Sequence, residues 1–142
     1  MKIRPAKKSD LNEISKIFRT EILRPPYNEK RASKKSLERV REFFKKKKIY
    51  VSTLYKEIIG FVVVSTDPDY PKKIYIDELW FKKKYQRKGM GQALMKYIED
   101  IYIKKGIKII KLVSSKKSGA FKFYKKLNFK ESDFLFMEKK LK

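Results

Sequence analysis

The 142-residue sequence predicts an α/β protein with a central mixed sheet, mostly antiparallel, that carries helices on both faces. One observation behind this prediction is that short apolar runs, typical of strands, alternate with longer stretches whose apolar residues recur at helical spacing. The other is the length of the connections. Short segments join three consecutive strand-like runs, which predicts antiparallel neighbours, whereas a helical stretch joins the third run to the next and predicts a parallel pair.

The first half of the chain is predicted to contribute three strands and two helices. Asp10 and Glu13 form a capping box that predicts where the first helix begins. Tyr55, Lys56 and Glu57 predict a tight turn between two strands. The predicted elements are a strand at 2–4, a helix ended by Pro25 and Pro26, a helix capped by Ser33 or Ser36, and strands at 49–54 and 58–65.

The second half is predicted to alternate strands and helices. Gly106 ends the long helix, Ser118 caps the last helix, and Asn128 follows it as a left-handed residue. No internal repeat or linker interrupts the pattern, so we expect one domain over residues 1–142. The predicted elements are strands at 73–81, 108–113 and 134–140 and helices at 90–104 and 119–126.

The composition excludes several kinds of chemistry. The chain contains no cysteine and no histidine, which excludes disulfides, thiolate nucleophiles, serine–histidine triads and ordinary zinc sites. Proton transfer must then involve Asp, Glu, Tyr, Lys, a bound water or the substrate. The N-terminal residues lack the apolar core of a signal peptide, and the apolar run at 58–64 is too short to span a bilayer. We therefore expect a cytoplasmic protein without a membrane partner.

The charge is strongly positive, with 39 Lys and Arg against 16 Asp and Glu, a net charge of +23. This excess favours a polyanionic ligand or neighbour, and association with nucleic acid or the ribosome is one explanation. A lysine-rich proteome is the other. The run Lys45–Lys48 is interpreted as a solvated helix end, because positive charge suits the negative end of a helix dipole.

The segment Gln86–Gly91, with the sequence Gln-Arg-Lys-Gly-Met-Gly, lies between a predicted strand and a predicted helix. Unpaired backbone N–H groups converge at such a helix start, and the helix dipole adds partial positive charge. Glycine leaves no side chain between the amide and a ligand. The segment is therefore a candidate diphosphate site.

The pattern Gln-x-x-Gly-x-Gly after a strand resembles the acyl-CoA-binding motif of the GCN5-related N-acetyltransferase (GNAT) family. Ile3–Ala6, followed by Ser9–Leu11, resembles the first strand and helix start of that family, and Phe123–Phe129 resembles the end of its late helix. The resemblance covers nearly the whole chain. It implies an acetyl-CoA-dependent N-acetyltransferase in which strands 73–81 and 108–113 splay apart to admit the pantetheine arm.

The resemblance also implies which residues bind acetyl-CoA. Backbone N–H groups at the helix start hold the diphosphate, and the backbone of the preceding strand pairs with pantetheine. Lys117 stands where the family often has asparagine, so it is expected to contact coenzyme phosphates instead. The expected coenzyme-binding residues are Leu79, Trp80, Phe81, Gln86, Arg87, Lys88, Gly89, Met90, Gly91, Gln92 and Lys117.

Acyl transfer to an amine requires a base, because an amine with a pKa of about 10.4 is almost fully protonated near pH 7. Asp77 and Glu78 are adjacent carboxylates in an otherwise apolar strand. Strand alternation predicts that they point to opposite faces, with Glu78 sharing the face of Ile76 and Trp80. The stretch is similar to one in polyamine acetyltransferases, and this resemblance points to Asp77 as the base.

Tyr124 is the candidate acid. The resemblance implies that its hydroxyl faces the coenzyme sulfur and donates a proton to the departing thiolate. Ala120, Phe123 and Leu127 recur at helical spacing, which predicts that they form the buried face of the helix and leave Tyr124 at its margin.

The acceptor is left open between a polyamine or small diamine, a protein N-terminus, a ribosomal lysine and an aminoglycoside. The segments 19–35 and 66–72 are expected to form its pocket, and a homodimer is possible. Two other functions compete with catalysis. One is a basic nucleic-acid-binding module that uses Lys45–Lys48 and Lys82–Lys84. The other is a coenzyme-A-binding regulatory relic.

Overall fold

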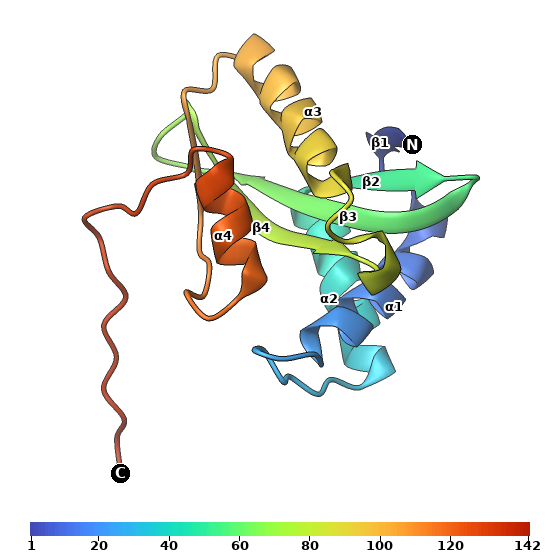
Figure 1. The fold of residues 1–142 in the computed structure, drawn as a ribbon, viewed down its shortest axis with the longest axis horizontal. Helices are drawn as coiled ribbons and strands as arrows, with labels where there is room; N and C mark the ends of the chain where they lie inside the picture. Colours follow the sequence, from blue (N-terminus) through green and yellow to red (C-terminus); the bar gives the residue numbers. More distant parts are fainter.

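The computed structural model describes residues 1–142 and contains one five-stranded sheet and four α-helices (Figure 1). The predicted fold class is therefore confirmed. No helix of the structure is both long enough and apolar enough to cross a membrane. In chain order the elements are β1 (Lys2–Pro5), η1 (Lys8–Asp10), α1 (Leu11–Ile22), α2 (Ser33–Lys46), β2 (Lys48–Leu54), β3 (Glu57–Thr66), β4 (Lys73–Phe81), η2 (Lys83–Tyr85), α3 (Met90–Lys104), β5 (Ile109–Leu112) and α4 (Gly119–Lys126).

The strands follow one another across the sheet in the order β1-β2-β3-β4-β5. The first four are antiparallel neighbours, and β4 and β5 are parallel, as the connection lengths predict. Pairing between β4 and β5 ends at Ile76 and Leu112. The second half of β4, residues 77–81, therefore has no strand on its β5 side, and this is the expected splay.

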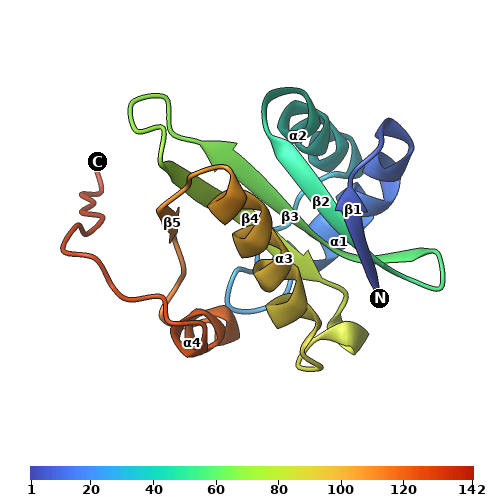
Figure 2. The same ribbon diagram turned by 90° about the horizontal axis from the view of Figure 1, so that it is seen from above.

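The helices cover both faces of the sheet, with α1 and α2 on one face and α3 on the other (Figures 1 and 2). Each layer has its own hydrophobic core. The core under α1 and α2 includes Phe18, Phe43 and Phe61, and Trp80 packs against it. The core under α3 includes Ile74, Ile76 and Phe81, and it is extended by Phe123 of α4 and by Leu127, the residue after α4.

A β-bulge interrupts β4 in the middle. Glu78 pairs with Val63 and Ile76 pairs with Val64, so Asp77 is an extra residue without a partner on β3. A bulge of this kind breaks the alternation of side chains along a strand. Ile76 consequently faces the α3 core whereas Trp80 faces the α1–α2 core. The prediction that Glu78 shares a face with Ile76 is wrong for this reason.

Helix starts differ from the prediction in their capping. The Asp10 carboxylate accepts the backbone N–H of Lys7 at 2.7 Å and binds Arg4 at 2.7 Å, which lowers its pKa. Glu13 instead pairs with Lys16 at 3.1 Å, so the expected Asp10–Glu13 box does not form. The N-cap of α2 is Ala32 rather than a serine. Ser118 does cap α4, and Gly106 and Asn128 are left-handed as predicted.

The predicted strand at 134–140 is absent. The segment after α4 is extended and runs away from the sheet (Figure 1). Phe134, Phe136 and Met137 expose 85%, 87% and 94% of their surface. A strand forms only when its backbone pairs with a neighbouring strand. Residues 134–140 pair with no strand of the sheet, although the outer edge of β5 is open.

Candidate active site

The glycine loop, residues 86–92, leads from the end of β4 into α3. Arg87 and Gly89 both have left-handed backbone, with φ of 60° and 80°. None of the backbone N–H groups from Arg87 to Gln92 finds an acceptor in the turn, loop and cap hydrogen bonds of the chain, as expected for the first turn of a helix. These donors and the positive end of the α3 dipole favour negative charge, so the loop is a candidate anion-binding surface.

The two glycines of the loop have different surroundings. A Cβ on Gly89 would meet nothing within 4 Å, so the space beside its backbone is open. A Cβ on Gly91 would lie 3.2 Å from the ring of Phe123 in α4. Gly89 therefore leaves room for a ligand at the loop, whereas Gly91 allows α3 and α4 to pack closely.

The side chain of Gln86 fixes the loop to the rest of the protein. Its Nε2 donates to the carbonyl of Phe81 at 2.7 Å and to Glu21 Oε1 at 3.1 Å. Glu21 is 4% exposed and also accepts from Arg24 Nε at 3.2 Å. The Gln86 amide thus joins the loop to the end of β4 and to α1, and does not point into the anion-binding surface.

Sequence reasoning missed Glu21. A signal for it was present, because Glu21 follows Phe18 by three residues and Ile14 by seven, on the apolar face of a predicted helix. A carboxylate in that position must be paired or hydrogen-bonded when the helix packs. The partner, Gln86, lies 65 residues away in the chain.

Both carboxylates of β4 point to the side of the sheet that α1 and α2 cover. Lys47, the residue after α2, donates to Asp77 Oδ2 at 2.9 Å. Trp80 Nε1 donates to Glu78 Oε1 at 2.8 Å. The predicted opposite orientation is wrong because the bulge at Asp77 brings the two side chains to one face.

The two carboxylates have different electrostatic environments. Asp77 is held in an ion pair. Burial raises the pKa of the Glu78 carboxyl above its ordinary value, and the Trp80 hydrogen bond offsets part of that rise. Arg39 and Arg31 lie close enough to lower the Glu78 pKa slightly, while Asp77 raises it. The Glu78 carboxylate therefore accepts a proton more readily than an exposed glutamate does.

Tyr124 is the buried residue of α4, with 9% of its surface exposed. It lies deeper than Phe123 and Leu127, which the helical spacing predicts to be the buried face. Its ring packs against Phe123 and Phe129 at centroid distances of 5.2 and 5.5 Å. Burial raises the pKa of the hydroxyl far above its ordinary value, so the hydroxyl keeps its proton at neutral pH.

Glu78 acts electrostatically on Tyr124 although the two residues come from different elements. After burial, the nearby groups that raise the Tyr124 pKa are Tyr27 and Glu78. Tyr27 lies edge-on to Trp80 at 5.1 Å between ring centroids, and Trp80 donates to Glu78. Four side chains thus lie close together near the splay: Tyr27, Glu78, Trp80 and Tyr124. Tyr27 belongs to the segment 19–35 that was expected to line the acceptor pocket.

Lys117 lies outside this group. It is exposed on the turn before α4, and its backbone N–H donates to Ser115 Oγ at 3.2 Å. Its ammonium group makes no ion pair, so it is free to reach a phosphate. Leu79 and Phe81 contribute their side chains to the α3 core. Their backbone pairs with β3 but not with β5, and the Phe81 carbonyl already accepts from Gln86.

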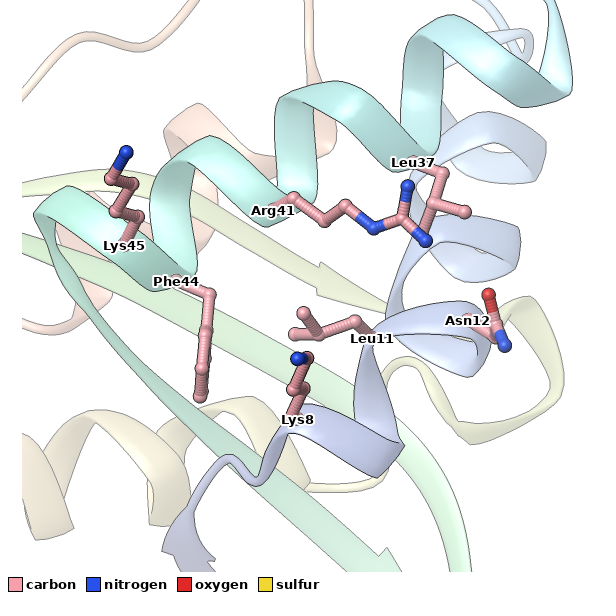
Figure 3. Close-up of a pocket in the computed structure, with 7 residues that line it drawn as sticks. All are labelled: Lys8, Leu11, Asn12, Leu37, Arg41, Phe44 and Lys45. Atoms are coloured by element: carbon pink, nitrogen blue, oxygen red, sulfur yellow. The ribbon is translucent and has the colours of Figure 1, made fainter.

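The lysine run 45–48 does not form one free patch. Lys46 pairs with Glu42, Lys47 pairs with Asp77, and Lys48 begins β2. Lys45 lines a groove of about 490 Å³ between α1 and α2 (Figure 3). None of the predicted site residues lines this groove, whose walls are Lys8, Leu11, Asn12, Leu37, Arg41, Phe44 and Lys45.

A second open cavity, of about 590 Å³, lies between α1 and the segment that precedes the glycine loop. Glu21 and Arg24 line one side and Lys82–Lys84 the other. Lys82 is already paired with Glu57 at 2.7 Å. Lys83 and Lys84 make no ion pair and place positive charge beside the loop.

Several solved acetyltransferase structures have the same fold. A possible acetyltransferase from Clostridium difficile 630 has a TM-score of 0.85 and 23% identity, over 99% of this chain and 97% of that one. An aminoglycoside acetyltransferase from an uncultured soil metagenomic sample, in complex with sisomicin, has a TM-score of 0.73 and 19% identity, over 99% and 96%. Aminoglycoside N-acetyltransferase AAC(6')-Iy, in complex with CoA, has a TM-score of 0.78 and 16% identity, over 98% and 93%.

Sequence comparison gives the family directly. No curated protein sequence is similar enough to this chain to count as a match. The family model described as the acetyltransferase (GNAT) family matches residues 15–129, which include β4, the glycine loop and Tyr124. The chain therefore belongs to the GNAT family of acetyl-CoA-dependent acetyltransferases.

Proposed function

We propose that this protein transfers the acetyl group of acetyl-CoA to a primary amine by direct attack of the amine on the thioester. The backbone N–H groups of residues 87–92 hold the coenzyme diphosphate. The pantetheine arm lies in the splay, along the side of residues 77–81 that no strand pairs with. The observation that carries this proposal is the position of the unpaired N–H groups of the loop directly after the open half of β4.

In the proposed reaction the amine nitrogen bonds to the carbonyl carbon and the carbon–sulfur bond then breaks. A backbone N–H of residues 79–81 polarises the carbonyl oxygen. Glu78 takes the amine proton through a water molecule, and the Tyr124 hydroxyl gives its proton to the thiolate. Solvent restores both groups, so atoms and charge balance over one turnover.

Glu78 is a better candidate base than Asp77 for two reasons. The Asp77 carboxylate already binds the Lys47 ammonium group at 2.9 Å, so it is occupied within the protein. Glu78 has one hydrogen bond, from Trp80, and its pKa is raised towards the range in which a carboxylate accepts protons near neutral pH. This reverses the assignment that the sequence resemblance favoured.

Tyr124 suits the role of the acid because its hydroxyl is protonated, buried and without a hydrogen-bond partner in the chain. A hydroxyl that spends no hydrogen bond on the protein is available to a thiolate. The neighbouring Tyr27 and Trp80 provide an aromatic surface next to Glu78, and such a surface attracts a cationic amine before it loses its proton.

We propose a polyamine or small diamine as the acceptor, with a protein amine as the second class. The adjacent acids and the aromatic surface support a small cationic acceptor. Two of the similar structures are aminoglycoside acetyltransferases, so aminoglycosides belong in the same screen. Thiol release from acetyl-CoA, followed with each acceptor class in turn, tests the proposal. Thermal stabilisation by acetyl-CoA without turnover on any amine would contradict catalysis and favour a regulatory coenzyme-binding protein.

A further inference from the structure

The groove between α1 and α2 combines an apolar surface with positive charge (Figure 3). Leu11, Leu37 and Phe44 supply the apolar surface, and the three charged residues of its lining are all cationic. Its volume of about 490 Å³ lies within the range of pockets that bind small ligands or parts of larger ones. The groove takes no part in the proposed acetyl transfer, because none of the predicted site residues lines it.

The cations of this groove have no partner within the chain. Lys8, Arg41 and Lys45 take part in none of its ion pairs. Lys34 is also exposed and unpaired, and it lies seven residues before Arg41 on the same side of α2. At a rise of about 1.5 Å per residue, the row from Lys34 to Lys45 is about 16 Å long. Free positive charge therefore continues along α2 beyond the groove.

The second cavity, beside the glycine loop, differs in its charge balance. Glu13 and Glu21 line it together with its cations. Lys16 pairs with Glu13 at 3.1 Å and Arg24 pairs with Glu21 at 3.2 Å. That cavity balances part of its charge within its own lining. The groove between α1 and α2 does not, so its charge is left for an anion from outside the chain.

Phe44 gives the groove an accessible aromatic ring. The preceding residue, Phe43, is 1% exposed in the α1–α2 core, whereas Phe44 is 37% exposed. Its ring points from α2 towards Lys8 and Leu11 across the groove (Figure 3). Proteins bind single-stranded nucleic acid with this combination, because bases stack on the aromatic ring while phosphates meet the cations.

We propose that the groove between α1 and α2 binds single-stranded nucleic acid, as a function separate from acetyl transfer. One base stacks on Phe44, and the neighbouring phosphates bind Lys8, Arg41 and Lys45. In a duplex the bases stack on one another and are not open to the ring, and an acidic peptide carries no base. The net charge of +23, of which a coenzyme needs only a few charges, draws such a polymer to the protein.

Fluorescence anisotropy of the full chain with a labelled oligouridylate of about 12 nucleotides tests the proposal. Lys8→Glu/Arg41→Glu removes two phosphate contacts. The slope of log K against log salt should therefore become shallower by about 1.4, at about 0.7 for each contact. Lys104→Glu/Lys105→Glu is the matched control, with the same net charge. Its lysines are exposed at the end of α3, on the other face of the sheet, and it should keep the parent slope (Figure 1).

The aromatic contact has its own variants. Phe44→Ala should weaken binding roughly 5- to 150-fold, which corresponds to the loss of one stacked base, and Phe44→Tyr should bind like the parent. Tyr55→Ala, on the β2–β3 turn where the side chain is 95% exposed, should bind like the parent too. Saturating acetyl-CoA should not displace the oligonucleotide, because no expected coenzyme-binding residue lines the groove.

Three results would overturn the proposal. Equal losses of affinity and slope in the two charge-reversed proteins would mean that the oligonucleotide responds to net charge alone. Equal affinity for a duplex of the same length would exclude stacking on Phe44. Displacement by polyglutamate as effective as by unlabelled oligouridylate would assign the groove to an acidic protein segment. None of these results bears on thiol release from acetyl-CoA, so the proposed catalysis stands or falls separately.

Discussion

The glycine loop and the carboxylate pair of β4 lie eight residues apart in the chain but depend on different features of it. The loop is built from backbone: two left-handed residues and a helix start leave N–H groups unpaired. The carboxylate pair depends on side chains that a bulge in β4 brings to the same face of the sheet. Backbone sites follow from local sequence, whereas side-chain sites depend on how distant strands pair.

The largest expected effect is the loss of acetyl-CoA affinity when Gly89 of the loop is replaced by glutamate. In Gly89→Glu the new carboxylate occupies the open space where the diphosphate is expected. Like charges about 4 Å apart repel by about 4 kcal/mol near a protein surface, which corresponds to about 1,000-fold weaker binding. Calorimetric titration with acetyl-CoA measures the change.

Gly106→Glu is the matched control. Gly106 has φ of 84° and, like Gly89, nothing within 4 Å of an added Cβ. Both variants should lose about 1–2 kcal/mol of folding stability from the left-handed backbone. Only Gly89→Glu should lose acetyl-CoA, and equal losses of affinity in the two variants would contradict the role of the loop.

The next effect concerns Tyr124. Tyr124→Phe removes the proposed acid and keeps the ring packing, so we expect turnover to fall about 100-fold, the lower end for general acid catalysis. Acetyl-CoA affinity should not change. Tyr102→Phe is the control. Tyr102 is also buried, but its hydroxyl forms a 3.2 Å hydrogen bond with Tyr50, and neither tyrosine is a predicted site residue. An unchanged turnover in Tyr124→Phe would exclude the role of proton donor.

Glu78→Gln tests whether a carboxylate of β4 is the base. Turnover should fall roughly 10- to 100-fold, at or below the low end for a general base, because solvent water can accept part of the proton. In the parent protein, activity should fall as the pH drops through the raised Glu78 pKa, since only the carboxylate form is a base. This acid limb of the pH–rate profile should disappear in Glu78→Gln.

Stability should change in the opposite direction from activity at this position. A carboxyl whose pKa is raised by folding favours the folded state most when protonated, below its unfolded pKa, and that contribution is lost as the pH rises through the folded pKa. Glu78→Gln should therefore be at least as stable as the parent at neutral pH in urea unfolding. Asp77→Asn, which breaks the Lys47 ion pair, should leave the acid limb of the pH–rate profile in place. An acid limb that disappears in Asp77→Asn and persists in Glu78→Gln would make Asp77 the base.

The smallest effect tests the link between α1 and the loop. Glu21→Ala removes the acceptor of the Gln86 amide, and a lost hydrogen bond of about 0.5–1.5 kcal/mol corresponds to a roughly two- to tenfold rise in KM for acetyl-CoA. The KM of the amine should not change. Glu13→Ala, which removes an exposed pair with Lys16, is the control and should change neither constant.

The elements of the sheet and helices could be predicted because their signals are local. The glycine turn, the Ser118 cap and the left-handed Asn128 each follow from a few neighbouring residues. The register of β4 could not be predicted, because the extra residue at Asp77 is defined only by pairing with Val63 and Val64 on β3. A one-residue shift moves every later side chain to the other face.

Two further differences have the same non-local origin. The segment 134–140 has the composition of a strand, but composition does not say which edge it pairs with. Gln86 matches the motif, yet its side chain bonds Glu21 and the Phe81 carbonyl. A motif gives the residue type, and the direction of the side chain depends on partners that are distant in sequence.

Amide NMR during a coenzyme A titration tests most directly whether bare backbone donors hold the ligand. We predict that the N–H resonances of residues 87–92 show the largest shifts in the protein, since each gains a charged acceptor, while those around Gly106 do not move. Saturating coenzyme that leaves the resonances of residues 87–92 in place would contradict the proposed binding site and the mechanism that depends on it.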